Sequence, residues 1–332
     1  MGTSFFARVK QLQNLMEDKF DKILISDPNN IYYYTGHKTA DDMCFLVVDS
    51  SKKPHLFVSP LVNEAKKIKT ARVSFIKKDF LSNELKDSTI GFEDGLPSGT
   101  YISLRKSKIK LKPSADMTYK PREIKDSYEI MQMKHAIKIV GNVLKDRDKF
   151  IGMNEDKVAR DIELYYHKHG RERSFQAVVA TGSNGQYIHY TPGSQKIKPT
   201  DLTVIDTGAK VNGYCSDITR TLHPKLNSEK KKIHSSIKEI QGKLIDVIEE
   251  GMTLDLLQKT YESLMKVRNY KVKHMISHGI GLSVHESVNE LKSGMVITVE
   301  PGVYTNRGGC RIEDMILIKK SGVKVLSDSI PL

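Results

Sequence analysis

The stretch "VIDTGAKVNGYCSDITRT", residues 204–221, decides the fold because it is a hairpin with an acid on each strand. Val, Ile, Tyr and Thr side chains suit a half-buried strand, whereas aspartate does not. Asn212-Gly213 lies between the two strands and is the dipeptide most typical of a tight hairpin turn. The two acids, Asp206 and Asp217, therefore lie on strands that are otherwise suited to burial.

The register of this hairpin decides whether its two aspartates can act together. A turn centred on Asn212-Gly213 places Asp217 opposite Gly208, with Asp206 as its diagonal neighbour; a turn centred one residue earlier places the acids directly opposite. Side chains alternate between faces with a period of two, so both registers put the carboxylates on one face, roughly 5 to 8 Å apart. A three-residue loop would separate them.

A second hairpin with two acids is predicted in "VITVEPGVYTNRGGCRIEDMILI", residues 296–318. With its tip at Asn306-Arg307, Glu300 and Glu313 are directly opposite on one face. Two helical patterns and a strand precede the first hairpin, and two helical patterns and a histidine-containing stretch precede the second. The order of elements therefore occurs twice. This order suggests an internal duplication, although the letters themselves repeat poorly.

Four amphipathic helices are predicted around these hairpins. Asp126 caps the first, with Glu129 as its reciprocal partner, and Asn154 caps a second that ends at Gly170. Asn227 or Ser228 starts the third, which ends near residue 251. Thr253 caps the fourth. Apolar residues recur at spacings of three and four in the first, third and fourth, namely Ile130, Met133, Ile137, Val140 and Leu144; Ile233, Ile237, Ile240 and Leu244; and Leu254, Leu257, Tyr261 and Leu264.

Residues 1–115 predict a small α/β domain. The strands expected are "KILIS", "IYYY", "CFLVVD", "HLFVS", "VSFI" and "TIGFE", and the helices are "FARVKQLQNLMEDKF" and "PLVNEAKKIK". This region contains no Gly-rich phosphate loop and no cluster of acids or histidines. The segment "KLKPSADMTYKPREIKD", with two prolines, is the best linker candidate.

The bulk composition limits the classes of protein that the chain can be. Its 332 residues allow two domains, and 39% hydrophobic with 28% charged residues is ordinary for a soluble protein. No apolar run approaches the roughly 18 residues of a membrane span, and no secretory signal is visible. Three widely spaced cysteines argue against a disulfide framework. A cytoplasmic setting is the simplest expectation.

The net charge of +13 raises the question of a nucleic-acid partner. The basic residues, however, are spread over the whole chain and mixed with acids, as in "SEKKKIHSSIKEIQGK". No row of arginines alternates with aromatic residues. A solvated, lysine-rich surface is therefore expected rather than a nucleic-acid interface.

The electrostatics of four acids favour a metal site over four solvated side chains. Two unit charges about 4 Å apart repel by roughly 4 kcal/mol at an effective dielectric of about 20. Four converging carboxylates would therefore protonate or separate unless cations lay among them. "HMISHGIGLSVHE" supplies His274, His278 and His285, one of which would be a fifth ligand.

Four carboxylates and one imidazole, without thiolate, suit Mn, Co, Fe or Zn, and a pair of ions better than one. Two divalent ions would balance the four negative charges. A water bridging two ions can fall from a pKa of about 15.7 to about 7, which supplies hydroxide at neutral pH. The residues thus predict hydrolytic chemistry.

The motifs "IDTGAKVNGYCSDITRT", "SHGIGLSVHE", "VITVEPGVY" and "GGCRIED" resemble, in order and spacing, those of the pita-bread metallopeptidases: prolidase (Xaa-Pro dipeptidase), aminopeptidase P and methionine aminopeptidase. The similarity covers about residues 120–320. Residues 1–118, with "NNIYYYTG" and "IGFE", look like the N-terminal domain of prolidases and aminopeptidases P. The resemblance implies an α+β protein, with a small α/β domain over 1–118 and a pseudo-twofold pita-bread catalytic domain of creatinase/aminopeptidase type over 119–332.

The resemblance also implies roles for individual residues. The metal ligands would be Asp206, Asp217, His278, Glu300 and Glu313, with Asp217 and Glu313 bridging two divalent ions, Mn or Co before Zn or Fe. Glu300 would also carry protons. The other three matches are substrate-side: His189 in "SNGQYIHYTPG", His285 beside the scissile carbonyl, and Arg311 beside the bridging glutamate.

The implied function is cleavage of Xaa-Pro bonds by a metal-bridging hydroxide, in a cytoplasmic homodimer that acts on small peptides with proline at the second position. One departure from the family matters: "SVNELKSGM", after His285-Glu286, is short and lacks the expected proline and arginine. Removal of the first residue from longer Xaa-Pro peptides, as by aminopeptidase P, is therefore the alternative. A non-catalytic pita-bread binding module would suit the positive charge, but the five retained ligands disfavour it.

Overall fold

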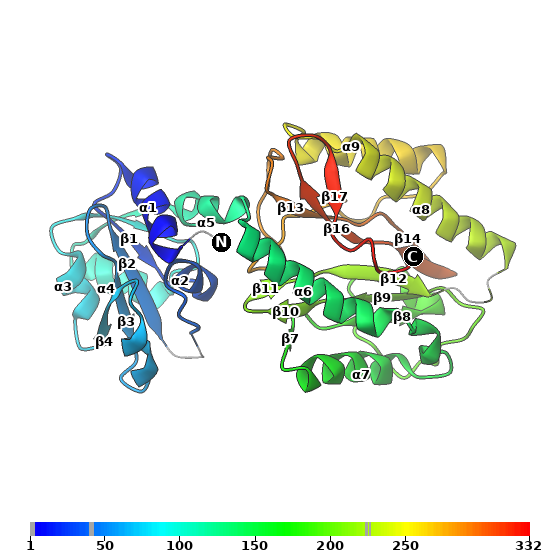
Figure 1. Ribbon diagram of the computed structural model, residues 1–332, viewed down its shortest axis with the longest axis horizontal. Coiled ribbons are helices and arrows are strands. Elements are labelled where there is room, and N and C mark those ends of the chain that lie inside the picture. The colour runs from blue at the N-terminus through cyan, green and yellow to red at the C-terminus, as the bar shows by residue number, and fades with distance from the viewer. Residues whose placement is uncertain (1–3, 40–42, 223–224, 226) are drawn as a thin grey trace. The chain divides into compact units, whose positions relative to one another are not determined.

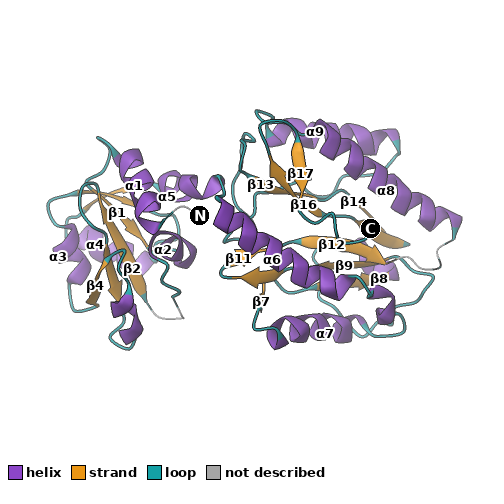
Figure 2. Cartoon of the chain, viewed as in Figure 1, coloured by secondary structure: helices purple, strands orange, loops and turns teal. Residues whose placement is uncertain are grey.

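The computed structural model describes residues 4–39, 43–222, 225 and 227–332, and the chain divides into two compact units, Met1–Arg122 and Glu123–Leu332. Figures 1 and 2 show the helices and strands of each unit. In the part of the chain that is described, no helix combines the length and the apolar character needed to cross a bilayer.

The first unit is built on a six-stranded mixed sheet with the order β4-β3-β2-β1-β5-β6. β2 pairs antiparallel with β1 and β3, and the other neighbours are parallel. The strands are β1 (Lys22–Ile25), β2 (Cys44–Asp49), β3 (His55–Val58), β4 (Arg72–Phe75), β5 (Thr89–Phe92) and β6 (Lys110–Pro113). The helices are α1 (Phe5–Met16), α2 (Pro28–Thr35), α3 (Phe80–Leu85), α4 (Ser98–Lys106) and α5 (Ala115–Glu123).

Two predictions for this unit are wrong. The "IYYY" segment is not a strand but part of α2, because the Asp27 side chain accepts a hydrogen bond from the Asn30 amide and Pro28 occupies the first turn. Gly36 then ends the helix in the left-handed conformation, at φ 75°. The "PLVNEAKKIK" helix is reduced to a short 3-10 helix, Asn63–Lys67, which has no side-chain cap. The linker candidate contains β6 and α5.

The second unit contains the repeated order that the sequence suggested. Two helices precede one group of strands, and two more helices precede another. The first group is α6 (Ser127–Leu144), α7 (Glu155–Lys168), β7 (Glu172–Arg173), β8 (Val178–Thr181), β9 (Thr203–Thr207), β10 (Ala209–Val211), β11 (Tyr214–Cys215) and β12 (Ile218–Leu222). The second is α8 (Ser228–Val247), α9 (Leu254–Val267), β13 (Val296–Val299), β14 (Gly302–Thr305), β15 (Gly308–Arg311), β16 (Asp314–Ile318) and β17 (Val323–Val325).

The helices of the second unit cover its strands with their apolar faces. In Figure 1, α8 and α9 lie on one side of the strands and α7 on the other. The predicted capping box of Asp126 and Glu129 is confirmed, as are the caps at Asn227 and Thr253. α8 buries Ile237, Ile240 and Leu244 in a core cluster that also contains Leu257, Tyr261 and Ile297. This packing holds the second hairpin against its two helices.

A buried cation joins the two groups of strands. Arg220 on β12 is 1% exposed, and its guanidinium donates to the Asp314 carboxylate on β16 at 2.7 Å and to the Glu313 carbonyl at 2.7 Å. The Glu313 amide in turn donates to the Thr219 carbonyl at 3.1 Å. These bonds fix the acid-bearing segments of both hairpins side by side.

Candidate metal centre

The first hairpin adopts one of the two predicted registers. Val211 pairs with Tyr214, and Thr219 with Asp206, so the turn is centred on Asn212-Gly213. Both turn residues have positive φ, 49° and 86°, as a type I′ turn requires. Asp217 thus faces Gly208, and Asp206 is its diagonal neighbour.

Gly208 is needed for this close approach. A Cβ atom at that position would lie 1.9 Å from the Ser216 carbonyl oxygen. The ladder is interrupted here, between β9 and β10 on one strand and between β11 and β12 on the other. The interruption allows Asp217, beside Ser216, to lie outside regular strand pairing.

The second hairpin has the register predicted for it. Thr305 pairs with Gly308 across the Asn306-Arg307 tip, and Val299 pairs with Asp314. The same register places Glu300 opposite Glu313, again at an interruption of the ladder, between β13 and β14 and between β15 and β16. Each hairpin therefore presents its acids where regular strand pairing stops.

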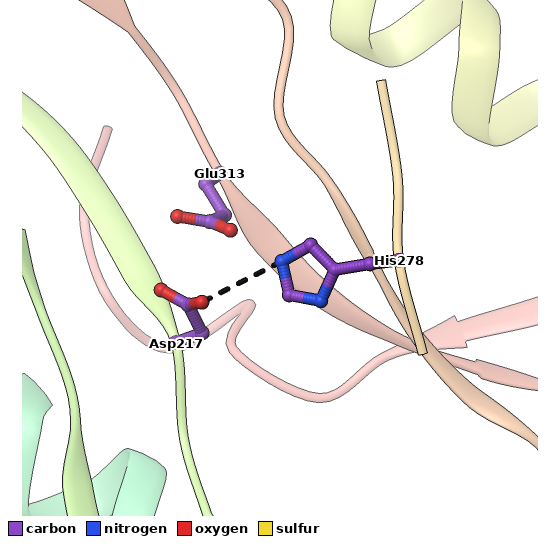
Figure 3. A group of neighbouring side chains, drawn as sticks. All are labelled: Asp217, His278 and Glu313. Atoms are coloured by element: carbon purple, nitrogen blue, oxygen red, sulfur yellow. Dashed lines mark ion pairs between the residues drawn. The ribbon is translucent and has the colours of Figure 1, made fainter. Parts of the chain in front are cut away.

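Three side chains from separate segments converge at the centre, as Figure 3 shows for Asp217, His278 and Glu313. One potential ligand atom from each lies within 4.8 Å of the others. His278 Nε2 is 3.7 Å from Asp217 Oδ2 and 3.4 Å from Glu300 Oε1. The residues predicted as ligands from different parts of the chain are therefore neighbours.

The protonation of His278 shows that this arrangement suits a cation. Its Nδ1 lies 3.0 Å from the Gly279 carbonyl oxygen, which can only accept, so Nδ1 carries the proton. Burial lowers the pKa of His278 to about 4, so at neutral pH its Nε2 is a lone pair directed at carboxylate oxygens. Asp206 Oδ1 is also buried without a hydrogen-bond partner. Acceptors that face acceptors fit bound metal ions.

The carboxylates resist ionisation when no cation is among them. Burial and then the charges of Glu313, Asp206 and Glu300 hold the pKa of Asp217 well above its usual range. Burial and the charges of Glu300 and Asp206 do the same for the pKa of Glu313. Burial raises the pKa of Glu300 to about 7. Each of these shifts would be opposed by a divalent cation between the acids.

All eight residues predicted for the site line one cavity of about 630 Å³. Besides the acids and His278, they include His189, His285 and Arg311. The rings of His278 and His285 lie edge to face with centroids 4.3 Å apart. The rest of the wall is largely apolar and includes Phe175, Val178, Ile188, Met275 and Val284.

Each of the three guanidinium nitrogens of Arg311 donates to a protein group. Its Nη2 donates to Asp206, its Nη1 to the Tyr304 hydroxyl at 2.9 Å, and its Nε to Thr219 Oγ1 at 3.0 Å. Thr219 Oγ1 in turn donates to Glu313 Oε2 at 2.8 Å. Arg311 therefore orients the acids, and its expected contact with substrate stays a prediction.

Two residues near the acids, His274 in the cavity wall and Tyr304 behind it, received no role from the sequence. His274 Nε2 lies 2.9 Å from the Tyr304 hydroxyl, which also accepts from Arg311, and burial lowers the pKa of His274 to about 4. Its Nδ1 lies 3.6 Å from Glu300 Oε2. Tyr304 lies four residues after Glu300, and His274 lies four residues before His278. These spacings are visible in the sequence, but nothing in the sequence shows that the two side chains meet.

Comparison with known proteins gives a family match for each unit of the chain. Residues 131–320 match the model of metallopeptidase family M24, and residues 8–124 match the creatinase/prolidase N-terminal domain. The Xaa-Pro dipeptidase of Pyrococcus furiosus is 32% identical over 96% of this chain and 97% of its own length.

Solved structures show the same similarity over both units. The prolidase of Pyrococcus horikoshii superposes with a TM-score of 0.91 and 31% identity, covering 97% of this chain and 98% of that one. The X-Pro aminopeptidase of Thermotoga maritima superposes with a TM-score of 0.84 and 26% identity, covering 93% and 95%. The predicted α+β fold, a small α/β domain followed by a pita-bread domain, is confirmed. The chain therefore belongs to metallopeptidase family M24, a family of peptidases that depend on divalent metal ions.

Proposed function

We propose that this chain cleaves Xaa-Pro peptide bonds in the manner of a prolidase, with two divalent metal ions held by five side chains: Asp206, Asp217, His278, Glu300 and Glu313. The observation that supports this most strongly is the neutral His278 ring, whose Nε2 lone pair lies 3.4 and 3.7 Å from two carboxylates. Such a contact needs positive charge between the acceptors, which the protons of the carboxyl groups supply in the metal-free protein and metal ions would supply in the loaded one.

The donor set favours a pair of ions of intermediate hardness. Four carboxylates balance the charge of two divalent ions, and the imidazole adds none. Mn or Co suits this oxygen-rich set, with Zn or Fe as alternatives. Divalent ions, when bound, supply hydroxide at neutral pH and polarise a carbonyl.

The residues of this chain divide the remaining tasks. Glu300, which lies beside His278, can accept a proton from the attacking water and return it to the leaving amine. His285, whose ring packs edge to face with that of His278, can donate to the carbonyl oxygen as negative charge develops there. Arg311 holds Asp206 in place. His189 lines the same cavity and would contact the substrate.

The substrate class follows from the relatives and from the cavity wall. The Pyrococcus relatives are named Xaa-Pro dipeptidase and prolidase, and this chain is similar to them over nearly its whole length. The cavity wall includes the apolar side chains of Phe175, Val178, Ile188 and Val284. A proline ring that packs on them would be removed from water, which is favourable for an apolar group. Small peptides with proline at the second position are therefore the proposed substrates.

One observation favours longer Xaa-Pro peptides, as cleaved by an aminopeptidase P. Arg311 contributes the guanidinium of the cavity wall, and its three donor nitrogens are engaged by Asp206, Tyr304 and Thr219. Arg307, at the tip of the second hairpin, is exposed and pairs with Glu229. Among the residues that line the described cavity, the one guanidinium therefore already serves three protein acceptors, which disfavours it as the anchor for the carboxylate of a dipeptide. The homodimer and the cytoplasmic setting stay predictions.

A peptide panel tests the proposal. The chain is stripped of metal, loaded with Mn or Co, and assayed on Xaa-Pro dipeptides, the corresponding amides and Xaa-Pro-containing longer peptides. We expect cleavage that depends on metal and on proline at the second position. His278→Ala should lose both metal and activity, whereas His167→Ala, a substitution on an exposed face of α7, should keep both. Equal cleavage of peptides without proline would contradict the proposal.

A further inference from the structure

One wall of the cavity is a single loop. Residues 182–193 follow β8, and four consecutive side chains of this loop line the cavity: Ile188, His189, Tyr190 and Thr191. A rigid-body shift of the loop would therefore move the whole wall at once. What fixes the loop decides where His189 lies relative to the acids.

The carboxylate of Glu155, outside the cavity, closes the base of this loop. Glu155 is the first residue of α7 and is 0% exposed. Its Oε1 accepts from the Thr181 amide at 2.7 Å, and its Oε2 accepts from the Gly193 amide at 3.2 Å. One carboxylate thus binds the backbone on both sides of residues 182–192.

The same carboxylate also binds two side chains of the loop. Asn184 Nδ2 donates to both of its oxygens at 3.1 Å, and the Tyr190 hydroxyl donates to Oε2 at 3.1 Å. Tyr190 is the immediate neighbour of His189. Burial and then the Glu155 charge raise the pKa of Tyr190, as expected for a hydroxyl that donates to a carboxylate.

Neighbouring contacts reinforce this closure. The amides of Glu155 and Asp156 donate to the Gln195 and Gly193 carbonyls at 3.0 and 2.9 Å. Farther along the loop, Gly185 packs so closely on β15 that a Cβ atom there would lie 2.4 Å from the Gly309 amide nitrogen. Between these two fixed points, the segment that carries His189 has little freedom.

We propose that Glu155 is a positioning residue, which holds residues 182–193 so that His189 faces the bound peptide. The proposal rests on the peptidase function proposed above. Every partner of the carboxylate is a donor, so only a group with two acceptor oxygens satisfies them all. Glutamine has the same shape but would direct its own N–H groups at donors, leaving buried amides unsatisfied.

The test compares Glu155→Gln with Asp156→Asn. The second change removes the same charge from the same helical turn, but the Asp156 carboxylate pairs with Arg160, and the bond of Asp156 to the loop comes from its backbone amide, which asparagine keeps. For metal-loaded Glu155→Gln we expect kcat/KM to fall about 10- to 100-fold, mostly through KM. Metal content should be unchanged, and amide exchange in residues 182–193 should be faster. Asp156→Asn should resemble the wild type in all three.

A double-mutant cycle separates positioning from general destabilisation. If Glu155 acts through the loop, Glu155→Gln should lower kcat/KM by less than about twofold in a His189→Ala background. Should Glu155→Gln fold poorly, Asn184→Ala removes one donor from the same carboxylate and should shift KM and exchange in the same direction. The proposal would be overturned if the two substitutions lowered kcat/KM by independent factors that multiply in the double variant. It would also be overturned if amide exchange in residues 182–193 were unchanged in Glu155→Gln. A wild-type chain that cleaves no Xaa-Pro peptide would instead overturn the proposed function, because the exchange measurement needs no substrate.

Discussion

Asp217→Asn should abolish hydrolysis without destabilising the metal-free protein. Asp217 is 5% exposed, and burial together with the charges of Glu313, Asp206 and Glu300 holds its pKa well above the usual range. Asparagine keeps the shape but carries no charge. Without metal, the substitution therefore relieves repulsion, whereas a polar residue on an open strand would change little.

The size of both effects can be estimated from the structure. Potential ligand atoms of Asp217 and Glu313 lie within 4.8 Å of each other. Full unit charges 4.8 Å apart repel by about 3.5 kcal/mol at an effective dielectric of about 20, and partial protonation of the acids lowers this repulsion. Ions at about 1,000 times their dissociation constant stabilise the folded state by about 4 kcal/mol. For a domain of this size the ions would raise Tm by about 8 to 16 °C, and the variant should lose most of that shift.

Calorimetry of metal-free and metal-loaded protein, with a parallel assay on a Xaa-Pro peptide, measures both effects. Asp161→Asn is the matched control, because Asp161 is partly exposed and pairs with Lys157 on the same helix. We expect the Asp217→Asn protein to unfold no earlier than the wild type without metal, to respond weakly to Mn or Co, and to have no measurable turnover. Near-wild-type turnover, or an undiminished Tm response, would refute the assignment of Asp217 as a ligand.

Three further results are expected. The pKa of Glu300, about 7 against an ordinary 4.5, means that its contribution to stability is fully present below about pH 4.5 and is lost as pH rises to about 7. In urea titrations of metal-free protein, Glu300→Gln should therefore gain on the order of 3 kcal/mol relative to the wild type across that window, and a constant difference would contradict this. His285→Ala should keep its metal but lose about 100- to 1000-fold in turnover, and loss of metal in elemental analysis would make it a ligand instead. Equilibrium dialysis against Mn or Co should reach about two ions per chain, and saturation below one would exclude the dinuclear centre.

The hairpins could be predicted because their signals are local. Asn212-Gly213 and the alternation of side chains were enough to place Asp206 and Asp217 on one face, and the observed register is one of the two that were expected. The sequence could not choose between them, since both keep the same parity. Positive φ at both turn residues selects the observed one.

Other features depend on contacts that local patterns do not contain. The aromatic run in α2 has strong strand propensity, but the Asp27 cap and Pro28 favour helix. Glu155 looks like an ordinary acid in a first helical turn, and its role depends on donors from residues 181–193. Similarly, the contact of Tyr304 with His274 requires that two distant segments meet.

The four acids of the two hairpins could be assigned to one site because charges repel across space, whatever their separation in the sequence. A carboxylate is uncommon in a strand that is suited to burial, and four carboxylates close together repel one another. Their presence in the sequence therefore indicates a missing positive charge before any contact is known. The structure gives this conflict a definite form, in which lone pairs face one another and pKa values are displaced by burial. A fold that tolerates the conflict must be held together elsewhere, and the buried pair of Arg220 with Asp314 lies one residue from Glu313 and joins both hairpins. Removing the Arg220 charge should therefore weaken the hairpin junction whether or not metal is bound, whereas the cost of the acids themselves should vanish once the ions are present.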